Sequence, residues 1–274
     1  MKPAPFDYRR PQTLAEALQT LAGEPNAKVL AGGQSLVPLL SMRLAAPSLL
    51  VDINGLPGLA DVRVSDEGVH VGALARHADV LASVEARRVQ PLLAMALEHV
   101  AHATIRNRGT TVGSIVHADA AAEMPVVLSL LGGSVDVEST AGRRTIAATD
   151  LYLGPLESAL HHDEIAVSAF FPAPPAGAGV AFEEIARRHG DYALAGVAAL
   201  VDGDSVRCGF VSVADVPTVV DLSGVPLDQV AEAALAHLEP ADDIHATAAY
   251  RAQLVRVLTE RVVRAAHDDA KERR

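Results

Sequence analysis

Two glycine-bearing segments constrain this chain more than any other feature of its sequence. Residues 31–35 read Ala-Gly-Gly-Gln-Ser and residues 110–114 read Thr-Thr-Val-Gly-Ser; we call them loop 1 and loop 2. Because glycine has no Cβ, its N–H can approach a phosphate closely, and the residue can adopt the positive φ that tight turns need. One such loop alone is a weak signal. A pair in one chain indicates a bound nucleotide with a diphosphate.

The size and charge of the chain narrow its partners. With 274 residues it is long enough for a full core and for two or three subdomains. Its formal net charge is -11 and it holds no basic tract. We therefore expect no nucleic-acid partner, since phosphate-backbone binding depends on clustered Lys and Arg.

The longest apolar run, residues 193–201, is far shorter than the ~20 residues that span a bilayer. The start of the sequence also lacks the apolar stretch of a signal peptide, so we expect a soluble cytoplasmic protein without a membrane span.

Cysteine usage limits the redox chemistry that the chain can house. Cys208 is the only cysteine, so no internal disulfide can form. An iron–sulfur cluster normally takes four cysteines or a mixture of Cys and His. Any such cluster that works with this protein must therefore lie on another chain.

The N-terminal part of the sequence alternates helix and strand. Thr13 is placed to cap the first helix, and Glu16 is placed for a capping box. The expected elements are a helix over residues 14–21, a strand over 28–31 that leads into loop 1, a helix over 36–44 and a strand over 49–53.

The rest of the chain is divided by a Pro-rich linker candidate at residues 172–177. Before it we expect strands at 62–64, 68–72, 134–138 and 164–170 and helices at 77–84 and 91–102. After it we expect strands near 179–187, 193–201 and 206–213 and helices at about 227–237 and 247–266. In the last helix, the spacing of Leu254, Val257, Leu258 and Val262 indicates packing against a sheet. The charged tail from 268 to 274 is expected to fray.

Loop 1 and loop 2 each admit an ordinary structural interpretation. Loop 1 lies between a strand and a helix, which presents N–H groups to an anion, but it matches neither GxGxxG nor the Walker A pattern. A plain strand-to-helix turn explains it equally well. Residues 109–114 hold three hydroxyls and two glycines. Such a group is costly in a core, because each buried hydroxyl needs a partner.

Two single residues admit functional and plain interpretations alike. Glu123 could accept hydrogen bonds from ribose hydroxyls, or it could be a solvated acid at a helix start. Tyr192 follows a Gly-Asp pair between two expected strands. A planar side chain there suits stacking on a planar cofactor, and a half-buried surface tyrosine is the alternative.

Metal binding and nucleophilic catalysis find little support. His99 and His102 share a helix face, and His117, Asp119 and Glu123 follow. Metal ligands usually need further hydrogen-bonding partners, and histidines scattered over an acidic surface are the commoner case, so we expect no metal. The sequence has no Gly-x-Ser-x-Gly elbow, and we expect no catalytic side chain.

Four segments, taken in order, resemble those of a known family. They are residues 31–36 (Ala-Gly-Gly-Gln-Ser-Leu), residues 105–125 (Ile-Arg-Asn-Arg-Gly-Thr through Glu-Met-Pro), residues 186–197 (Ala-Arg-Arg-His-Gly-Asp-Tyr-Ala-Leu-Ala-Gly-Val) and residues 243–251 (Asp-Ile-His-Ala-Thr-Ala-Ala-Tyr-Arg). They resemble the medium subunit of molybdenum hydroxylases, the enzymes of the carbon monoxide dehydrogenase and xanthine dehydrogenase type. The matches cover nearly the whole chain, which makes them more specific than any single loop.

The resemblance implies an α+β fold and an FAD site. Residues 1–58 and 59–173 would form a two-part FAD-binding region of the vanillyl-alcohol oxidase type, and residues 178–274 a C-terminal domain of antiparallel sheet plus helices. The FAD diphosphate would lie between loop 1 and loop 2, with Glu123 at the adenosine part and Tyr192 beside the isoalloxazine. The implied cofactor residues are Lys28, Ala31, Gly32, Gly33, Gln34, Ser35, Thr110, Thr111, Val112, Gly113, Ser114, Glu123 and Tyr192.

Two positions depart from the family pattern. Val112 stands where the family usually has the first Gly of Thr-Ile-Gly-Gly-Ser, and Ala120 stands where Pro is usual. A β-branched residue would be strained if that position took a positive φ or met a phosphate directly. On this expectation FAD affinity is lowered or loop 2 is rearranged.

The resemblance further implies a flavoprotein subunit that relays electrons. Substrate would be oxidised at a molybdenum–pterin centre on a large subunit. Electrons would pass through [2Fe-2S] clusters on a small subunit to FAD in this chain, and then to an external acceptor. We expect a heterotrimer or its dimer. The alternatives are a stand-alone FAD-dependent oxidoreductase and a non-catalytic scaffold subunit that has lost FAD.

Overall fold

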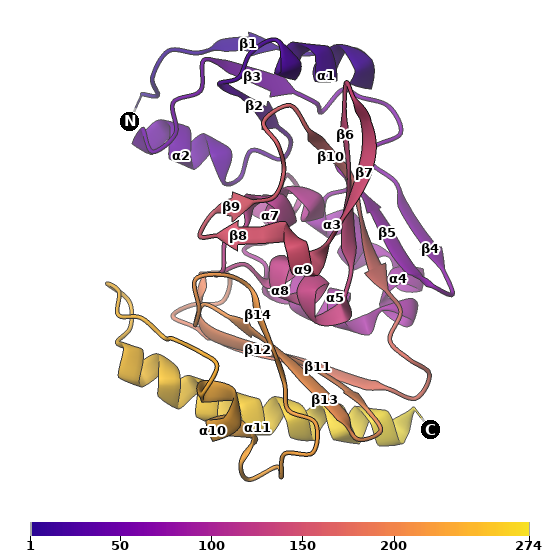
Figure 1. Ribbon diagram of the computed structural model, residues 1–274, viewed down its shortest axis with the longest axis vertical. Coiled ribbons are helices and arrows are strands. Elements are labelled where there is room, and N and C mark those ends of the chain that lie inside the picture. The colour runs from indigo at the N-terminus through magenta and orange to yellow at the C-terminus, as the bar shows by residue number, and fades with distance from the viewer. Residues whose placement is uncertain (1, 274) are drawn as a thin grey trace.

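The computed structural model describes residues 2–273, in which three larger β-sheets follow one another along the long axis of the molecule (Figure 1). The N-terminal sheet lies at one end and the C-terminal sheet, covered by a long helix, lies at the other. The middle sheet and its helices lie between them. The succession of sheets follows the order of the chain.

The N-terminal sheet is parallel and places loop 1 at one of its edges. Its strand β3 (Leu49–Asp52) lies between β1 (Asp7–Arg9) and β2 (Ala27–Leu30). Helices α1 (Leu14–Ala22) and α2 (Leu36–Met42) connect the strands. Because β2 and β3 are parallel, their carboxyl ends meet at the same edge of the sheet. Loop 1, which follows β2, therefore lies near the residues that follow β3.

The ends of α1 and α2 follow local hydrogen bonding. Thr13 Oγ1 accepts the N–H of Glu16 at 3.2 Å, as the predicted N-cap should. In the predicted capping box, the Glu16 carboxylate would accept the N–H of Thr13, the N-cap residue. It accepts the N–H of Gln12 instead, at 2.8 Å, so this hydrogen bond is displaced by one residue. Helix α2 ends before the predicted boundary because Arg43 takes a left-handed φ of 60°.

The middle sheet is antiparallel, with strand order β4-β5-β10-β6-β7. Its strands are β4 (Val62–Ser65), β5 (Gly68–Gly72), β6 (Ser134–Ser139), β7 (Gly142–Ala147) and β10 (Ile165–Pro172). A separate hairpin joins β8 (Tyr152–Gly154) to β9 (Glu157–Ser158). The expectations at 62–64, 68–72, 134–138 and 164–170 are confirmed as β4, β5, β6 and β10, whereas β7, β8 and β9 were not predicted.

Short helices cover the middle sheet. They are α3 (His77–Ala82), α4 (Val84–Val89), α5 (Pro91–His99), α6 (Ala103–Arg106), α7 (Thr111–His117), α8 (Glu123–Leu131) and α9 (Ala148–Leu151). The helix predicted over 77–84 divides at Ser83, whose backbone is extended. The helix predicted over 91–102 ends at His99, and Ala101 beyond it has a φ of 45°.

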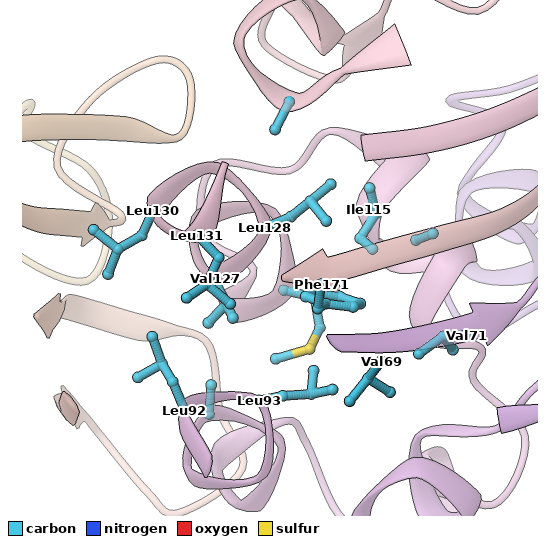
Figure 2. Close-up of a cluster of buried hydrophobic side chains, with 14 of the residues drawn as sticks. Val69, Val71, Leu92, Leu93, Ile115, Val127, Leu128, Leu130, Leu131 and Phe171 are labelled. Carbon is cyan, nitrogen blue, oxygen red and sulfur yellow. The ribbon is translucent and has the colours of Figure 1, made fainter. Parts of the chain in front are cut away.

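The largest hydrophobic cluster lies where α5, α7 and α8 pack against the middle sheet (Figure 2). Leu93, Ile115 and Leu128, one from each helix, lie around Phe171 of β10 and are almost fully buried. Since α7 begins within loop 2, this cluster anchors loop 2 to the core of the middle region.

The C-terminal sheet is antiparallel and packs on α8. It contains β11 (Gly179–Ala186), β12 (Ala193–Asp202), β13 (Ser205–Val211) and β14 (Thr218–Asp221), in that order. A Cβ on Gly209 of β13 would lie 2.6 Å from Val126 Cγ1 of α8, so this glycine permits a close approach. Strand β14 was not predicted. Helices α10 (Val230–Leu235) and α11 (Ala248–Glu272) follow.

Helix α11 packs against the C-terminal sheet as predicted, and three of the four side chains that indicated this packing, Leu254, Leu258 and Val262, lie in or against the cluster there. Val255, Leu258 and Val262 are buried in the cluster that it forms with the sheet, whereas Val257 is 43% exposed. Figure 1 shows α11 running along the outer side of this sheet. Within residues 2–273 no helix is long and apolar enough to cross a membrane.

The fraying expected after residue 268 is wrong for the part of the tail that the structure describes. Helix α11 continues to Glu272, and Asp269 Oδ2 accepts the N–H of Val180 at 2.8 Å. A Cβ on Gly179 would lie 2.0 Å from Ala266 O, so strand and helix backbones are in contact here. This tertiary contact holds the last turns of α11 in place. Arg274 lies outside the described residues.

Candidate cofactor site

Loop 1 presents unpaired main-chain donors. Gly33 has a φ of 72°, and its carbonyl accepts the N–H of Val37 at 3.0 Å. The Gln34 side chain turns back to donate to Gly32 O at 3.0 Å. Among residues 2–273, no acceptor faces the N–H groups of Gly33, Gln34 and Ser35. Successive free N–H groups of this kind can bind an anion.

Main-chain hydrogen bonds join loop 2 to the segment that leads into α3. Thr110 and Arg76 form an isolated antiparallel bridge, in which Thr111 donates its N–H to Ala75 O at 3.3 Å and His77 donates its N–H to Gly109 O at 3.0 Å. Thr110 also caps α7, because its Oγ1 accepts the N–H of Gly113 at 3.2 Å. Most of loop 2 is therefore the first turn of a helix and not a free turn.

His77 lies buried beneath loop 2. Its Nδ1 is 3.1 Å from Thr111 Oγ1, and a Cβ on Gly109 would lie 2.9 Å from its Cδ2. Burial, with a smaller contribution from the Arg106 cation, lowers the pKa of His77 to about 4. The ring is therefore neutral at neutral pH. Sequence reasoning missed this residue, since one histidine at a helix start carries no distinguishing pattern.

The backbone strain expected at Val112 is absent. Val112 lies in the first turn of α7 and is not among the described residues with positive φ. Its side chain is 1% exposed and belongs to the hydrophobic cluster of the middle region. The expectation of strain was wrong because a helical position that faces the core accepts a β-branched residue.

Loop 1 and loop 2 are in direct contact at Gly32. A Cβ on Gly32 would lie 2.5 Å from Arg108 O and 2.7 Å from Gly109 Cα, which directly precede loop 2, and 3.0 Å from the N of Thr110, the first residue of loop 2. Real Cβ atoms do not come this close to backbone atoms, so only glycine allows the approach. The fold thus brings together the two segments that the sequence singled out.

A chain of side-chain hydrogen bonds also joins loop 1 to the segment that directly precedes loop 2. Asn54 Nδ2 donates to Ala31 O at 2.8 Å, Arg76 donates to Asn54 Oδ1 at 2.7 Å, and Arg76 also donates to Arg108 O at 2.6 Å. Sequence reasoning missed both side chains. A signal was present for Asn54, because an Asp-x-Asn sequence begins at the last residue of a buried strand whose end lies beside loop 1.

Tyr192 and two carboxyl groups lie close together at the C-terminal sheet. Tyr192 is 63% exposed in the turn between β11 and β12. Partial desolvation, and then the charges of Asp119 and Glu123, raise the pKa of Tyr192 to about 12. Tyr192 and Asp119 also line a cavity of about 450 Å³ together with Leu156 and Arg251. A ligand that contacts Tyr192 therefore meets an acidic surrounding.

Glu123 is a buried group at the start of α8. It is 7% exposed, and burial followed by the charge of Glu184 raises the pKa of Glu123 to about 8. Glu184 lies 3.4 Å from His99 Nδ1 through one oxygen, and its other oxygen is buried without a hydrogen-bond partner in the described part of the chain. The alternative interpretation of Glu123 as a solvated acid is thus wrong, and its carboxyl group is mostly protonated at neutral pH.

The remaining candidates lie outside this arrangement. Lys28 is exposed on β2 and makes no hydrogen bond or ion pair to either loop within residues 2–273. No three His, Cys, Asp or Glu side chains in the described part of the chain are placed to hold a metal ion together.

Two family models match the chain. Residues 4–174 match the FAD binding domain in molybdopterin dehydrogenase, and residues 180–266 match the CO dehydrogenase flavoprotein C-terminal domain. Among curated relatives, the chain is 41% identical to the 6-hydroxypseudooxynicotine dehydrogenase complex subunit alpha of Paenarthrobacter nicotinovorans, over 96% of this chain and 95% of the relative. It is 38% identical to the nicotine 6-hydroxylase medium subunit of the same organism, over 96% and 98%.

Solved structures agree in fold over the whole length. Carbon monoxide dehydrogenase from Hydrogenophaga pseudoflava superposes with a TM-score of 0.92 at 32% identity, covering 98% of this chain and 99% of that one. Quinoline 2-oxidoreductase from Pseudomonas putida 86 superposes with a TM-score of 0.90 at 37% identity, with the same coverage.

Proposed function

The chain belongs to the family of FAD-binding medium subunits of molybdenum hydroxylases, and we propose that its loop 1 and loop 2 hold the FAD diphosphate between them. As a member of this family it is an oxidoreductase subunit that contains FAD and passes electrons through it. The membership confirms the resemblance, the α+β architecture, the cofactor and the electron-transfer function predicted from the sequence. When bound, FAD supplies the redox chemistry, and the residues of the chain bind and orient it.

The contact between loop 1 and loop 2 at Gly32 is the observation that carries this proposal. The donors beside it suit a diphosphate, since the N–H groups of Gly33, Gln34 and Ser35 face no acceptor among residues 2–273. Small residues leave the backbone accessible, and a diphosphate can accept hydrogen bonds from several N–H groups at once. The residues present therefore fit the group.

The other assigned residues act around the diphosphate. Thr110, Thr111, Gly113 and Ser114 form the loop 2 side, in which Thr110 and Thr111 are buried with their hydroxyls at Gly113 and His77, and Val112 fixes that side to the core. Tyr192 would lie beside the isoalloxazine. Because the Glu123 carboxyl group is mostly protonated at neutral pH, it can donate a hydrogen bond to the cofactor as well as accept one. Lys28 enters the assignment through the resemblance alone.

The partners are part of the proposal. We place the molybdenum–pterin centre on a large subunit and the [2Fe-2S] clusters on a small subunit, in a heterotrimer or its dimer. The single Cys208 supports this division, because it is buried and burial raises its pKa to about 12. Such a thiol is a poor cluster ligand. A cytoplasmic location and the division into residues 1–58, 59–173 and 178–274 remain predictions from the sequence.

Flavin content of the purified full chain tests the loop assignment. Gly33→Val should remove the yellow colour, because loop 1 needs a φ of 72° at this position and a Cβ would lie 3.2 Å from Leu30 Cδ1. Left-handed backbone costs a residue with a Cβ roughly 1–2 kcal/mol. The measurement is the absorbance ratio of flavin to protein after the wild type and the variant are loaded with FAD.

Gly58→Val is the matched control for this experiment. Gly58 has a φ of 74°, so the substitution brings the same backbone strain, but among residues 2–273 no atom lies within 4 Å of its Cβ position. We expect Gly58→Val to retain flavin. Wild-type flavin content in Gly33→Val would refute the assignment of loop 1.

A further inference from the structure

The side chain of Asn54 is oriented by its neighbours at the edge of the N-terminal sheet. Asp52 is buried. Its Oδ1 accepts two hydrogen bonds from Asn54, one from the main-chain N–H at 2.9 Å and one from the side-chain Nδ2 at 2.6 Å. Tyr8 donates its hydroxyl to Asp52 Oδ2. Burial alone would raise the pKa of Asp52, but these hydrogen bonds hold it below its ordinary value. An ionised Asp52 fixes which side of the Asn54 amide carries the nitrogen.

With its nitrogen fixed, Asn54 donates to one loop and accepts from Arg76. Its Nδ2 reaches Ala31 O, at 2.8 Å, and its Oδ1 accepts from Arg76 at 2.7 Å. Only an amide can donate on one side and accept on the other in this way. A carboxylate of the same shape has no donor for Ala31.

Arg76 completes the connection to the segment that leads into loop 2. One of its terminal nitrogens donates to Asn54 and the other donates to Arg108 O at 2.6 Å. The planar guanidinium can serve both acceptors, whereas the single ammonium of lysine is a point charge on a flexible stem. Arg76 is itself tied to loop 2, because it pairs with Thr110 across the isolated bridge.

We propose that Asn54 and Arg76 form a bridge that sets the spacing of loop 1 and loop 2 before the diphosphate binds. They are positioning residues, which act through the main chain of the two loops. The inference rests on the proposed function, since the spacing matters for a diphosphate held between the loops. It goes beyond that function because it assigns the geometry of the site to side chains outside both loops.

A double-mutant cycle on FAD affinity tests the bridge. The variants are Arg76→Lys, Asn54→Asp and the double variant, each in the full chain, and FAD is titrated into flavin-free protein while flavin fluorescence is followed. Each single change breaks the bridge at one end, so each should raise Kd about tenfold or more. The double variant should be little weaker than the weaker single variant, because a bridge already broken cannot be broken again.

Arg256→Lys is the control for an arginine-to-lysine change on the surface. Arg256 pairs with Glu232 at 2.6 Å in the C-terminal part of the chain, and we expect wild-type FAD affinity there. The melting temperature of each flavin-free variant reports on folding. If Asn54→Asp does not fold, Asn54→Ala takes its place in the cycle, because it removes the donor and the acceptor without adding a charge.

The outcomes separate the bridge from the proposed function. Wild-type affinity in Arg76→Lys would show that a positive charge suffices and would overturn the bridge. So would a double variant whose loss equals the product of the single losses, since Asn54 and Arg76 would then act independently. In both cases FAD still binds the wild type, and the proposed function stands. A wild-type chain that binds no FAD would overturn both.

Discussion

Loop 1 and loop 2 look alike in sequence but are built differently. Loop 1 has a left-handed glycine, and the N–H groups of Gly33, Gln34 and Ser35 have no acceptor among residues 2–273. Loop 2 is pinned to α3 by main-chain hydrogen bonds, capped by Thr110 and anchored in the core through Val112. One loop supplies free donors, and the other supplies a fixed surface against which they are held.

The difference teaches how a family pattern should be interpreted. A glycine is required where a backbone must approach closely or take positive φ; loop 1 has both requirements, at Gly32 and Gly33, and loop 2 has the first at Gly113, whose Cβ would lie 2.5 Å from Thr110 Oγ1. In loop 2 the position of Val112 has neither requirement. A departure from a Gly-rich pattern therefore matters only at positions where a Cβ would clash with neighbouring atoms or where the backbone takes a positive φ.

The largest effect is expected from Gly32→Ala, which would break the contact between the loops. The added Cβ would lie 2.5 Å from Arg108 O and 3.0 Å from Thr110 N, so loop 1 must move away from the start of loop 2. We expect loss of bound FAD, measured as the flavin-to-protein absorbance ratio. Gly23→Ala is the control, because the nearest atom to its Cβ position is Gln19 O at 3.4 Å, an ordinary contact. Full flavin content in Gly32→Ala would mean that the loops need not touch.

Sequence patterns predicted the parts of this fold that local residues determine. The helix capped by Thr13 and the apolar strand at 193–201 were found because caps and continuous apolar runs are visible in the sequence. Strand β7 was missed because it is a mostly exposed edge strand rich in polar residues. The last turns of α11 were missed because the contact of Asp269 with Val180 is tertiary.

The residues of the candidate site likewise divide into those with a local sequence signal and those recognised only by their tertiary contacts. Loop 1 and loop 2 carry a compositional signal, so both were found, but their contact at Gly32 was not predicted; the resemblance implied only that a diphosphate lies between them. Asn54, Arg76 and His77 act through residues far away in the sequence. No spacing or periodicity announces the contacts of Arg76 and His77, and only Asn54 had a local signal, the Asp-x-Asn sequence at the end of β3.

A smaller effect is expected from Val112→Gly, which restores the residue usual in the family. Removing a side chain that is 1% exposed, and adding helical backbone freedom, should lower the free energy of unfolding by about 3 kcal/mol. We expect no gain in FAD affinity. Chemical denaturation measures the first quantity and FAD titration the second. Val84→Gly, at a 74% exposed position in the first turn of α4, should cost about 1 kcal/mol or less. Tighter FAD binding by Val112→Gly would restore the view that Val112 weakens the site.

The smallest effect is expected from acid, acting on the histidine that supports loop 2. The pKa of His77 is about 4 in the fold against an ordinary value of 6.5, so the unfolded chain takes up a proton first as the pH falls. The contribution of this residue to stability is complete above pH 6.5 and decreases below it, by about 2 kcal/mol at pH 5. His77→Asn should remove this dependence of the unfolding free energy on pH. It is measured as the difference between wild-type and variant unfolding free energies, so that the contributions of other groups such as Glu123 cancel.

His162→Asn, on the exposed surface, is the control and should leave the pH dependence unchanged. If wild type and His77→Asn share one pH dependence, loop 2 does not rest on a neutral histidine, and its contrast with loop 1 depends on the main-chain bridge and the core alone.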